Sequence, residues 1–132
     1  MKALFFLIIF ICAGSQEFRL LKKIQTEGGS FVTDHLGNLY TVDGLKFAKY
    51  NPDGEETAHY SNAYYGEISY ADVTDPYRIL LYYRDFNQIL FLDKELSEIA
   101  SPIFLSDLSV EQATIACTSN RGGFWVYDRQ TP

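Results

Sequence analysis

The chain carries a weak internal repeat, and this repeat limits the possible folds more than any other feature of the sequence. Three times a strand-like run, a tight turn and a second strand-like run end in an aromatic residue or leucine followed by a turn residue, over residues 38–51, 79–93 and 114–128. The closing turn residues Asn51, Asp93 and Asp128 lie 42 and then 35 positions apart. One such unit cannot bury both of its faces, so each unit needs neighbours.

A period near 40 with several strands per unit predicts an all-β fold of antiparallel β-propeller-type blades. Turn chemistry supports it, because Asp43-Gly44 is a strong hairpin signal and Asn51-Pro52-Asp53-Gly54 combines the residues that tight turns prefer. We expect one helical turn within 105–111, and Pro102 favours an edge-like outer strand. The expected strands cover residues 18–24, 31–33, 39–42, 45–50, 57–60, 68–73, 78–83, 88–92, 98–105, 113–118 and 124–127.

The N-terminus has the layout of a secretory signal peptide. Lys2 supplies a positive start, residues 3–13 form an uninterrupted apolar run, and Ala13-Gly14-Ser15 places small residues before a cleavage at Gln16. The apolar run is too short to span a membrane, which takes about 20 residues. We therefore expect a signal peptide at 1–15, one partial repeat domain at 16–132, and a secreted or periplasmic location.

Cleavage there removes Cys12 and leaves Cys117 as the only cysteine, so no intrachain disulfide is expected. Cys117 lies in mid-strand without a neighbouring base, which predicts a small buried core residue. Lipid attachment at Cys12 is the alternative for the N-terminus, but Ile11 stands where a lipoprotein signal needs a small residue.

The cleaved chain would have 117 residues and a net charge of −7, since the loss of Lys2 changes the value of −6 for the whole chain. This balance argues against nucleic acid, whose binding depends on neutralising phosphates, and it favours a soluble chain. Aromatic side chains are abundant, with 10 tyrosines and 10 phenylalanines, and they favour strands.

Signs of an enzyme are sparse. His35 in a turn and His59 in an outer strand are expected to be solvated or locally hydrogen-bonded, and no nucleophile elbow, zinc-protease motif or phosphate loop occurs. Asp34, Asn38 and Asp75 are better explained as turn residues than as metal ligands. We predict no catalytic residue, metal site or cofactor.

The string Asp34-His-Leu-Gly-Asn-Leu-Tyr40, followed by Lys49-Tyr-Asn-Pro-Asp-Gly54, resembles a blade of secreted six-bladed, NHL-like β-propellers. Residues 18–130 are similar to uncharacterised propeller-like proteins of Bacteroidetes-type bacteria that carry signal peptides. The resemblance implies a complete propeller of at least four blades, whereas this sequence supplies about 2.5–3. Either the chain is a piece of a longer protein, which we expect, or partner chains complete it.

Aromatic and arginine side chains in the turns are the candidates for binding. The predicted interaction rim consists of Tyr64, Tyr65, Tyr82, Tyr83, Arg84, Phe86 and Arg121, with Arg84 and Arg121 placed in corresponding hairpin turns. Tyrosine and arginine are common in interface hot spots. The competing interpretation packs the tyrosines between blades. At the C-terminal end, Phe124, Trp125 and Tyr127 are expected to form an exposed blade end.

The sequence thus predicts a non-catalytic, secreted or periplasmic interaction module serving an envelope protein assembly, with a protein partner. The alternatives are a propeller enzyme or carbohydrate-binding propeller whose site lies in further blades, and a small open β-sheet protein complete at 132 residues. Open blades present unpaired edges, so we expect the isolated chain to be marginally stable, aggregation-prone or oligomeric through them.

Overall fold

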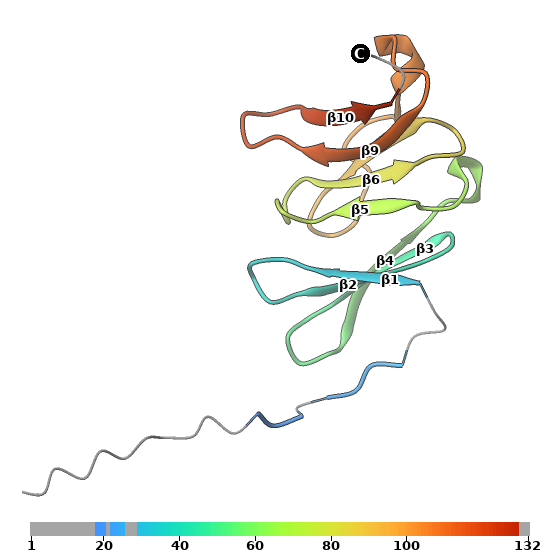
Figure 1. Cartoon of the computed structure of the whole chain (residues 1–132). Coiled ribbons are helices and arrows are strands. Elements are labelled where there is room, and N and C mark those ends of the chain that lie inside the picture. The colour runs from blue at the N-terminus through green and yellow to red at the C-terminus, as the bar shows by residue number, and fades with distance from the viewer. Residues whose placement is uncertain (1–17, 21, 26–28, 130–132) are drawn as a thin grey trace, which may run out of the picture.

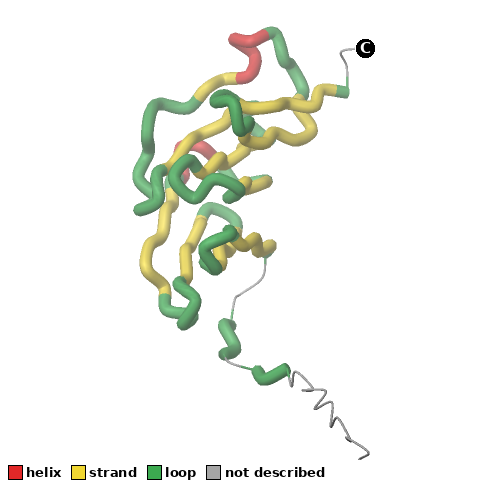
Figure 2. The backbone as a smooth tube through the Cα atoms, turned by 90° about the vertical axis from the view of Figure 1, so that its left-hand side faces the viewer, coloured by secondary structure: helices red, strands yellow, loops and turns green. Residues whose placement is uncertain are grey.

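The computed structural model describes residues 18–20, 22–25 and 29–129, and these residues form an all-β structure of antiparallel sheets. Three sheets lie one above another (Figure 1). Within the described ranges the only helices are two short 3-10 turns, η1 (Ala63–Tyr65) and η2 (Leu105–Leu108), and the remaining regular structure is strand (Figure 2). The predicted signal peptide at 1–15 lies outside the described residues.

The first sheet is a four-stranded meander, in which strands that follow one another in the chain pair with one another. Its strands are β1 (Ser30–Thr33), β2 (Leu39–Asp43), β3 (Lys46–Tyr50) and β4 (Glu56–Ser61). A hairpin joins β2 to β3 as predicted, but its two-residue loop is Gly44-Leu45 and not Asp43-Gly44, because Asp43 is the last residue of β2 and pairs with Lys46. Gly44, the first loop residue, has a positive φ of 55°.

The second sheet repeats this meander. Its strands are β5 (Tyr70–Asp72), β6 (Ile79–Tyr83), β7 (Gln88–Leu92) and β8 (Ile103–Phe104). Every residue of β6 and β7 is buried, as their nearly continuous apolar sequence predicted for strands covered on both faces. Pro102 lies directly before β8, and this edge strand is only two residues long.

The third sheet is a single hairpin of β9 (Ala113–Thr118) and β10 (Phe124–Asp128). Matching this hairpin with β2–β3 and β6–β7 on the basis of its closing turn residue was wrong. The turn between β9 and β10 lies against the turn between β5 and β6, since the Arg78 guanidinium donates to the Gly123 carbonyl at 3.0 Å. The hairpin therefore corresponds to the first two strands of each preceding sheet.

Two apolar layers hold the sheets together. The layer between the first and second sheets contains Tyr40, Val42 and Phe47 on one side and Ile79, Leu81, Tyr83, Leu90 and Leu92 on the other. The layer between the second and third sheets contains Leu80, Tyr82, Ile89, Phe91, Leu105, Ala113 and Ala116. Alternate residues of β6 and β7 thus enter different layers, so the second sheet is apolar on both faces.

The expected strand at 18–24 is absent from the described residues of that segment. Phe18 and Leu20 are exposed, so their apolar character does not reflect burial in a sheet. Residues 22–25 instead lie near the outer side of the first sheet, where the Lys22 ammonium donates to the Asp53 carbonyl at 3.0 Å.

Leu90→Ala should lower the free energy of unfolding by about 2–5 kcal/mol, because Leu90 is fully buried between the first two sheets and its truncation leaves a cavity. Leu108→Ala is the matched control, since Leu108 is 53% exposed and should change stability by less than about 0.5 kcal/mol. Urea unfolding of both variants measures the difference. Equal losses would contradict the two-layer core.

Candidate functional site

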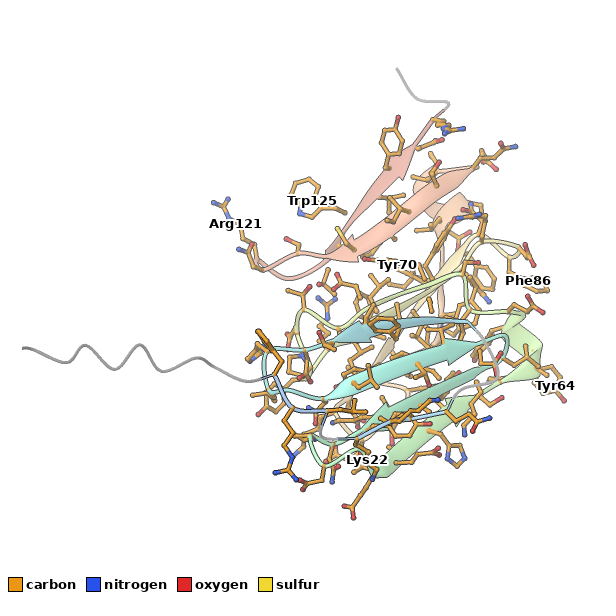
Figure 3. The ribbon with its side chains drawn as sticks, turned by 60° about the horizontal axis from the view of Figure 1, so that its bottom comes forward. Lys22, Tyr64, Tyr70, Phe86, Arg121 and Trp125 are labelled. Carbon is orange, nitrogen blue, oxygen red and sulfur yellow. The ribbon has the colours of Figure 1, made fainter. Side chains whose placement is uncertain are left out.

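The outer side of the third sheet presents an apolar surface to solvent. Trp125 and Tyr127 on β10 are 69% and 58% exposed, and Ile115 on β9 is 42% exposed. The register places Trp125 opposite Cys117 and Tyr127 opposite Ile115, so all four side chains lie on one side of the hairpin. We call these four residues the Trp125 face; Figure 3 labels Trp125 itself.

In each of the two preceding sheets, the side that is equivalent to the Trp125 face is buried. Strands β2, β6 and β10 are each five residues long, and aligning their first residues places Trp125 and Tyr127 in line with buried side chains. These equivalent side chains are at most 6% exposed and face the next sheet: Tyr40 and Val42 in β2, Leu80 and Tyr82 in β6. The third sheet therefore presents to solvent the kind of face that its predecessors cover.

A buried carboxylate fixes the third sheet to the second. Asp72, at the end of β5, accepts hydrogen bonds from the Thr118 backbone N–H at 2.7 Å, the Thr118 hydroxyl at 2.8 Å and the Thr74 N–H at 2.9 Å. Burial would raise the pKa of Asp72, but these hydrogen bonds outweigh it and hold the pKa below its usual value. The ionised carboxylate thus orients the start of the β9–β10 turn.

Aromatic contacts complete the same junction. The Tyr82 hydroxyl donates to the Ala113 carbonyl at 2.6 Å, and the Arg78 guanidinium lies 3.9 Å from the centre of the Phe91 ring. Phe91 in turn packs against Phe124 at a centroid distance of 6.3 Å. The hairpin is therefore anchored by its inner side, and its outer side is left to solvent.

A polar hollow of about 570 Å³ adjoins Trp125. It lies between the β5–β6 and β9–β10 turns, and its lining includes Asp75, Arg78, Thr118, Asn120 and Trp125. An exposed indole ring thus stands beside a polar depression at one end of the hairpin.

The structure separates the residues predicted for the blade end. Trp125 and Tyr127 are exposed, whereas Phe124 points to the opposite side of β10 and is half-buried against the second sheet. The predicted core position of Cys117 was also wrong, because this thiol is only half-buried and lies on the Trp125 face. Strand alternation explains both results, since the third sheet is covered on one side only.

Part of the predicted rim does gather at one end of the molecule. Tyr64 is 91% exposed and Phe86 is 54% exposed, and both lie at the same end in Figure 3. A Cβ at Gly66 would come within 2.7 Å of the Phe86 ring, which shows how closely the two turns approach. Tyr65 and Arg84 belong to these same turns.

The remaining rim residues lie elsewhere. Tyr82 and Tyr83 are fully buried, in different apolar layers, as the interpretation of tyrosines packed between blades predicted. Arg121 lies at the opposite end from Phe86 (Figure 3). Placing Arg84 and Arg121 on one rim was wrong because the third hairpin had been matched with the wrong strand pair.

A tyrosine cluster around Glu98 was not predicted from the sequence. The Glu98 carboxylate accepts hydrogen bonds from the Tyr60 hydroxyl at 2.6 Å, the Asn62 amide at 3.4 Å and the Tyr65 hydroxyl at 3.5 Å. Burial, reinforced by the hydrogen bond to Glu98, raises the pKa of Tyr60, so its hydroxyl stays protonated and donates. The cluster ties the first sheet to residues that follow β7, and a separation of 38 positions hid it from sequence patterns.

Chemistry-bearing residues are dispersed over the described part of the chain. No group of three or more histidine, cysteine, aspartate or glutamate side chains there could hold a metal ion. Asp34 accepts hydrogen bonds from the Leu36 and Asn38 backbone N–H groups and from the Tyr40 hydroxyl, which is the predicted turn chemistry. No helix among the described residues has the length and apolar content needed to cross a membrane.

No family model matches the sequence, and no curated protein or solved structure matches it. The case for a function therefore rests on the geometry of the chain itself. Among the surfaces described above, the Trp125 face is the one whose apolar exposure most needs an explanation.

Asp72→Asn should reduce the free energy of unfolding at pH 7 by about 1–3 kcal/mol, because it weakens charge-assisted hydrogen bonds to Thr118 and Thr74. The lowered pKa of the native Asp72 adds stability above the unfolded-state pKa of about 3.9, and this stability is lost as the pH falls through the lower folded-state value.

Denaturant unfolding between pH 7 and pH 2 measures both effects. The variant should show a flatter loss of stability below about pH 4, while Asp85→Asn in an exposed turn should follow the parent protein. An Asp72→Asn curve that stays parallel to the parent curve would argue against this role for Asp72.

Proposed function

We propose that this chain is a non-catalytic interaction module of β-propeller type that works outside the cytoplasm in a cell-envelope protein assembly. Repeated antiparallel meanders that stack face to face support the propeller-type architecture. The predicted signal peptide supports the location, and the net charge of −6 supports a partner other than nucleic acid.

The observation that carries the proposal is the exposed Trp125 face. Trp125, Tyr127 and Ile115 form a contiguous apolar surface where the two preceding sheets have buried contacts. Tryptophan and tyrosine are the side chains most enriched at the centres of protein interfaces, because one large ring excludes water at a small entropic cost. We take this face as the principal binding surface.

A second candidate function is carbohydrate binding, the chemistry of our alternative propeller class. The hollow beside Trp125 favours it, since an exposed aromatic ring there adjoins Asp75, Arg78 and Asn120. Such a combination of one apolar surface and several polar groups suits a sugar ring. This ligand would occupy the hollow and leave Tyr127 and Ile115 free.

Photo-crosslinking in native cells tests the proposed function. A photoreactive phenylalanine analogue at position 125 should give defined protein adducts in the cell envelope, because the Trp125 face is in contact with protein there. The same analogue at position 64 is the matched control, since Tyr64 is 91% exposed, more than Trp125 at 69%, and lies away from Trp125 in the molecule (Figure 3).

Adducts at position 125 that are absent at position 64 would support the interaction module. Adducts that contain carbohydrate without protein would favour the second candidate. No adduct at position 125 under conditions that label position 64 would refute both.

A further inference from the structure

We propose that the Trp125 face packs on the outward side of the first sheet of a second copy, so that copies of this chain join head to tail. The proposal rests on the binding surface assigned above and names its occupant. It follows from the way the three sheets already pack within one chain.

Each junction inside the chain joins two unlike faces. The side of the first sheet that points toward the following sheet, with Tyr40, Val42 and Phe47, is a face of the first kind. It packs on the side of the second sheet that points back toward the preceding sheet, with Ile79 and Leu81, which is a face of the second kind. The junction between the second and third sheets repeats this arrangement. The Trp125 face is of the first kind, so the repeat predicts that its complement is a face of the second kind.

The outward side of the first sheet is a face of that second kind. Its residues are equivalent to side chains that the second sheet buries against the first: Phe31 to Ala71, Leu39 to Ile79, Thr41 to Leu81 and Ala48 to Leu90. Phe31 is 73% exposed and Leu39 is partly exposed, whereas Thr41 and Ala48 are only 8% and 1% exposed because the chain itself already covers them. The open part of this side is therefore the area around Phe31 and Leu39. The described part of the chain thus presents two unlike faces to solvent, the Trp125 face and the area around Phe31 and Leu39, and in our proposal a second copy supplies the complement of each.

The outward side of the first sheet also has a place for a large ring. A hollow of about 400 Å³ lies between the segment at residues 22–24 and the sheet, with Ile24, Phe31, Leu39 and Thr41 in its lining. Lys22 lines the same hollow, and an ammonium group near an indole ring is attracted to its face. Trp125 is the most exposed ring of the Trp125 face, so the proposed contact places Trp125 of one copy in this hollow of the next.

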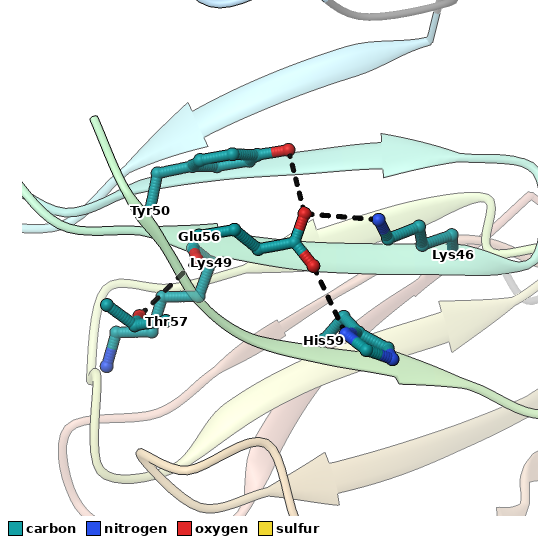
Figure 4. Close-up of polar contacts among 6 residues, drawn as sticks. All are labelled: Lys46, Lys49, Tyr50, Glu56, Thr57 and His59. Atoms are coloured by element: carbon teal, nitrogen blue, oxygen red, sulfur yellow. Dashed lines mark hydrogen bonds and ion pairs between the residues drawn. The ribbon is translucent and has the colours of Figure 1, made fainter.

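Charged groups border this apolar area on one side. The Glu56 carboxylate accepts hydrogen bonds from Lys46 at 3.2 Å, Tyr50 at 3.3 Å and His59 at 3.1 Å (Figure 4). The outward side of the first sheet thus has an apolar centre near Phe31 and a paired polar border toward β4, which is the usual layout of an interface.

Packing through faces differs from the pairing of sheet edges expected from the sequence. β4 brings the Glu56 carboxylate to one edge of the first sheet, where it pairs with the Lys46 ammonium, and charged side chains discourage edge pairing. A contact between unlike faces is heterologous, so it produces closed rings or open chains of copies. Two identical Trp125 faces would not reproduce the junctions seen within the chain.

The test uses the full-length protein and two variants, each with a charge in the centre of one face. We expect the parent protein to self-associate in sedimentation velocity at micromolar concentration. Trp125→Glu and Phe31→Glu should each weaken self-association at least tenfold. Tyr64→Glu, at an exposed position outside both faces, should behave like the parent protein.

Mixing the two variants gives the decisive readout. Trp125→Glu retains an intact first-sheet face and Phe31→Glu retains an intact Trp125 face, so the mixture should form a 1:1 complex that grows no further. Far-UV circular dichroism of each variant checks that both remain folded, as expected for substitutions at exposed positions.

A monomeric parent protein, or a mixture that stays monomeric while each variant is folded, would overturn the head-to-tail contact. A Trp125→Glu effect without any Phe31→Glu effect would overturn it as well, because it would indicate contact between two Trp125 faces. A monomeric parent protein that still gives protein adducts at position 125 would leave the proposed function standing with a different partner.

Discussion

The structure depends on the second sheet being apolar on both of its faces. Alternate residues of β6 and β7 enter two different layers, so this sheet is stable in water only when a neighbour covers each side. The first sheet and the β9–β10 hairpin provide that cover, and each of them has a further face of its own. The exposed rings of Trp125 and Tyr127 are a consequence of the same arrangement.

Polar contacts determine how the sheets sit on one another, because apolar burial has little directional preference. Asp72 holds Thr118 at the start of the β9–β10 turn, and Glu98 collects the hydroxyls of Tyr60 and Tyr65. Both carboxylates join segments that are far apart in the chain. They fix the orientation of the outer sheets and thereby the direction in which the Trp125 face points.

The strands and turns were largely predictable because their signals are local. The continuous apolar run of β7 lies where the sequence placed it, and the hairpin loop between β2 and β3 lies one residue later than predicted, at Gly44-Leu45. The matching of strands between repeats was not predictable, since turn residues look alike in the first and second hairpins of a unit. That error moved Arg121 to the wrong end, and a one-sided third sheet put Cys117 at half burial. The exposure of Trp125 and Tyr127 was anticipated, whereas the Glu98 cluster required the tertiary structure.

The meander topology has a consequence for synthesis of the protein. Each four-stranded sheet pairs only strands that are neighbours in the chain, so a sheet is complete as soon as its own residues have been made. The strands of the first sheet can thus pair while the ribosome produces the second sheet, and the inner face of the first sheet is buried once the second sheet packs against it. Growth of the fold follows the direction of translation and demands no long-range strand exchange between the four-stranded sheets.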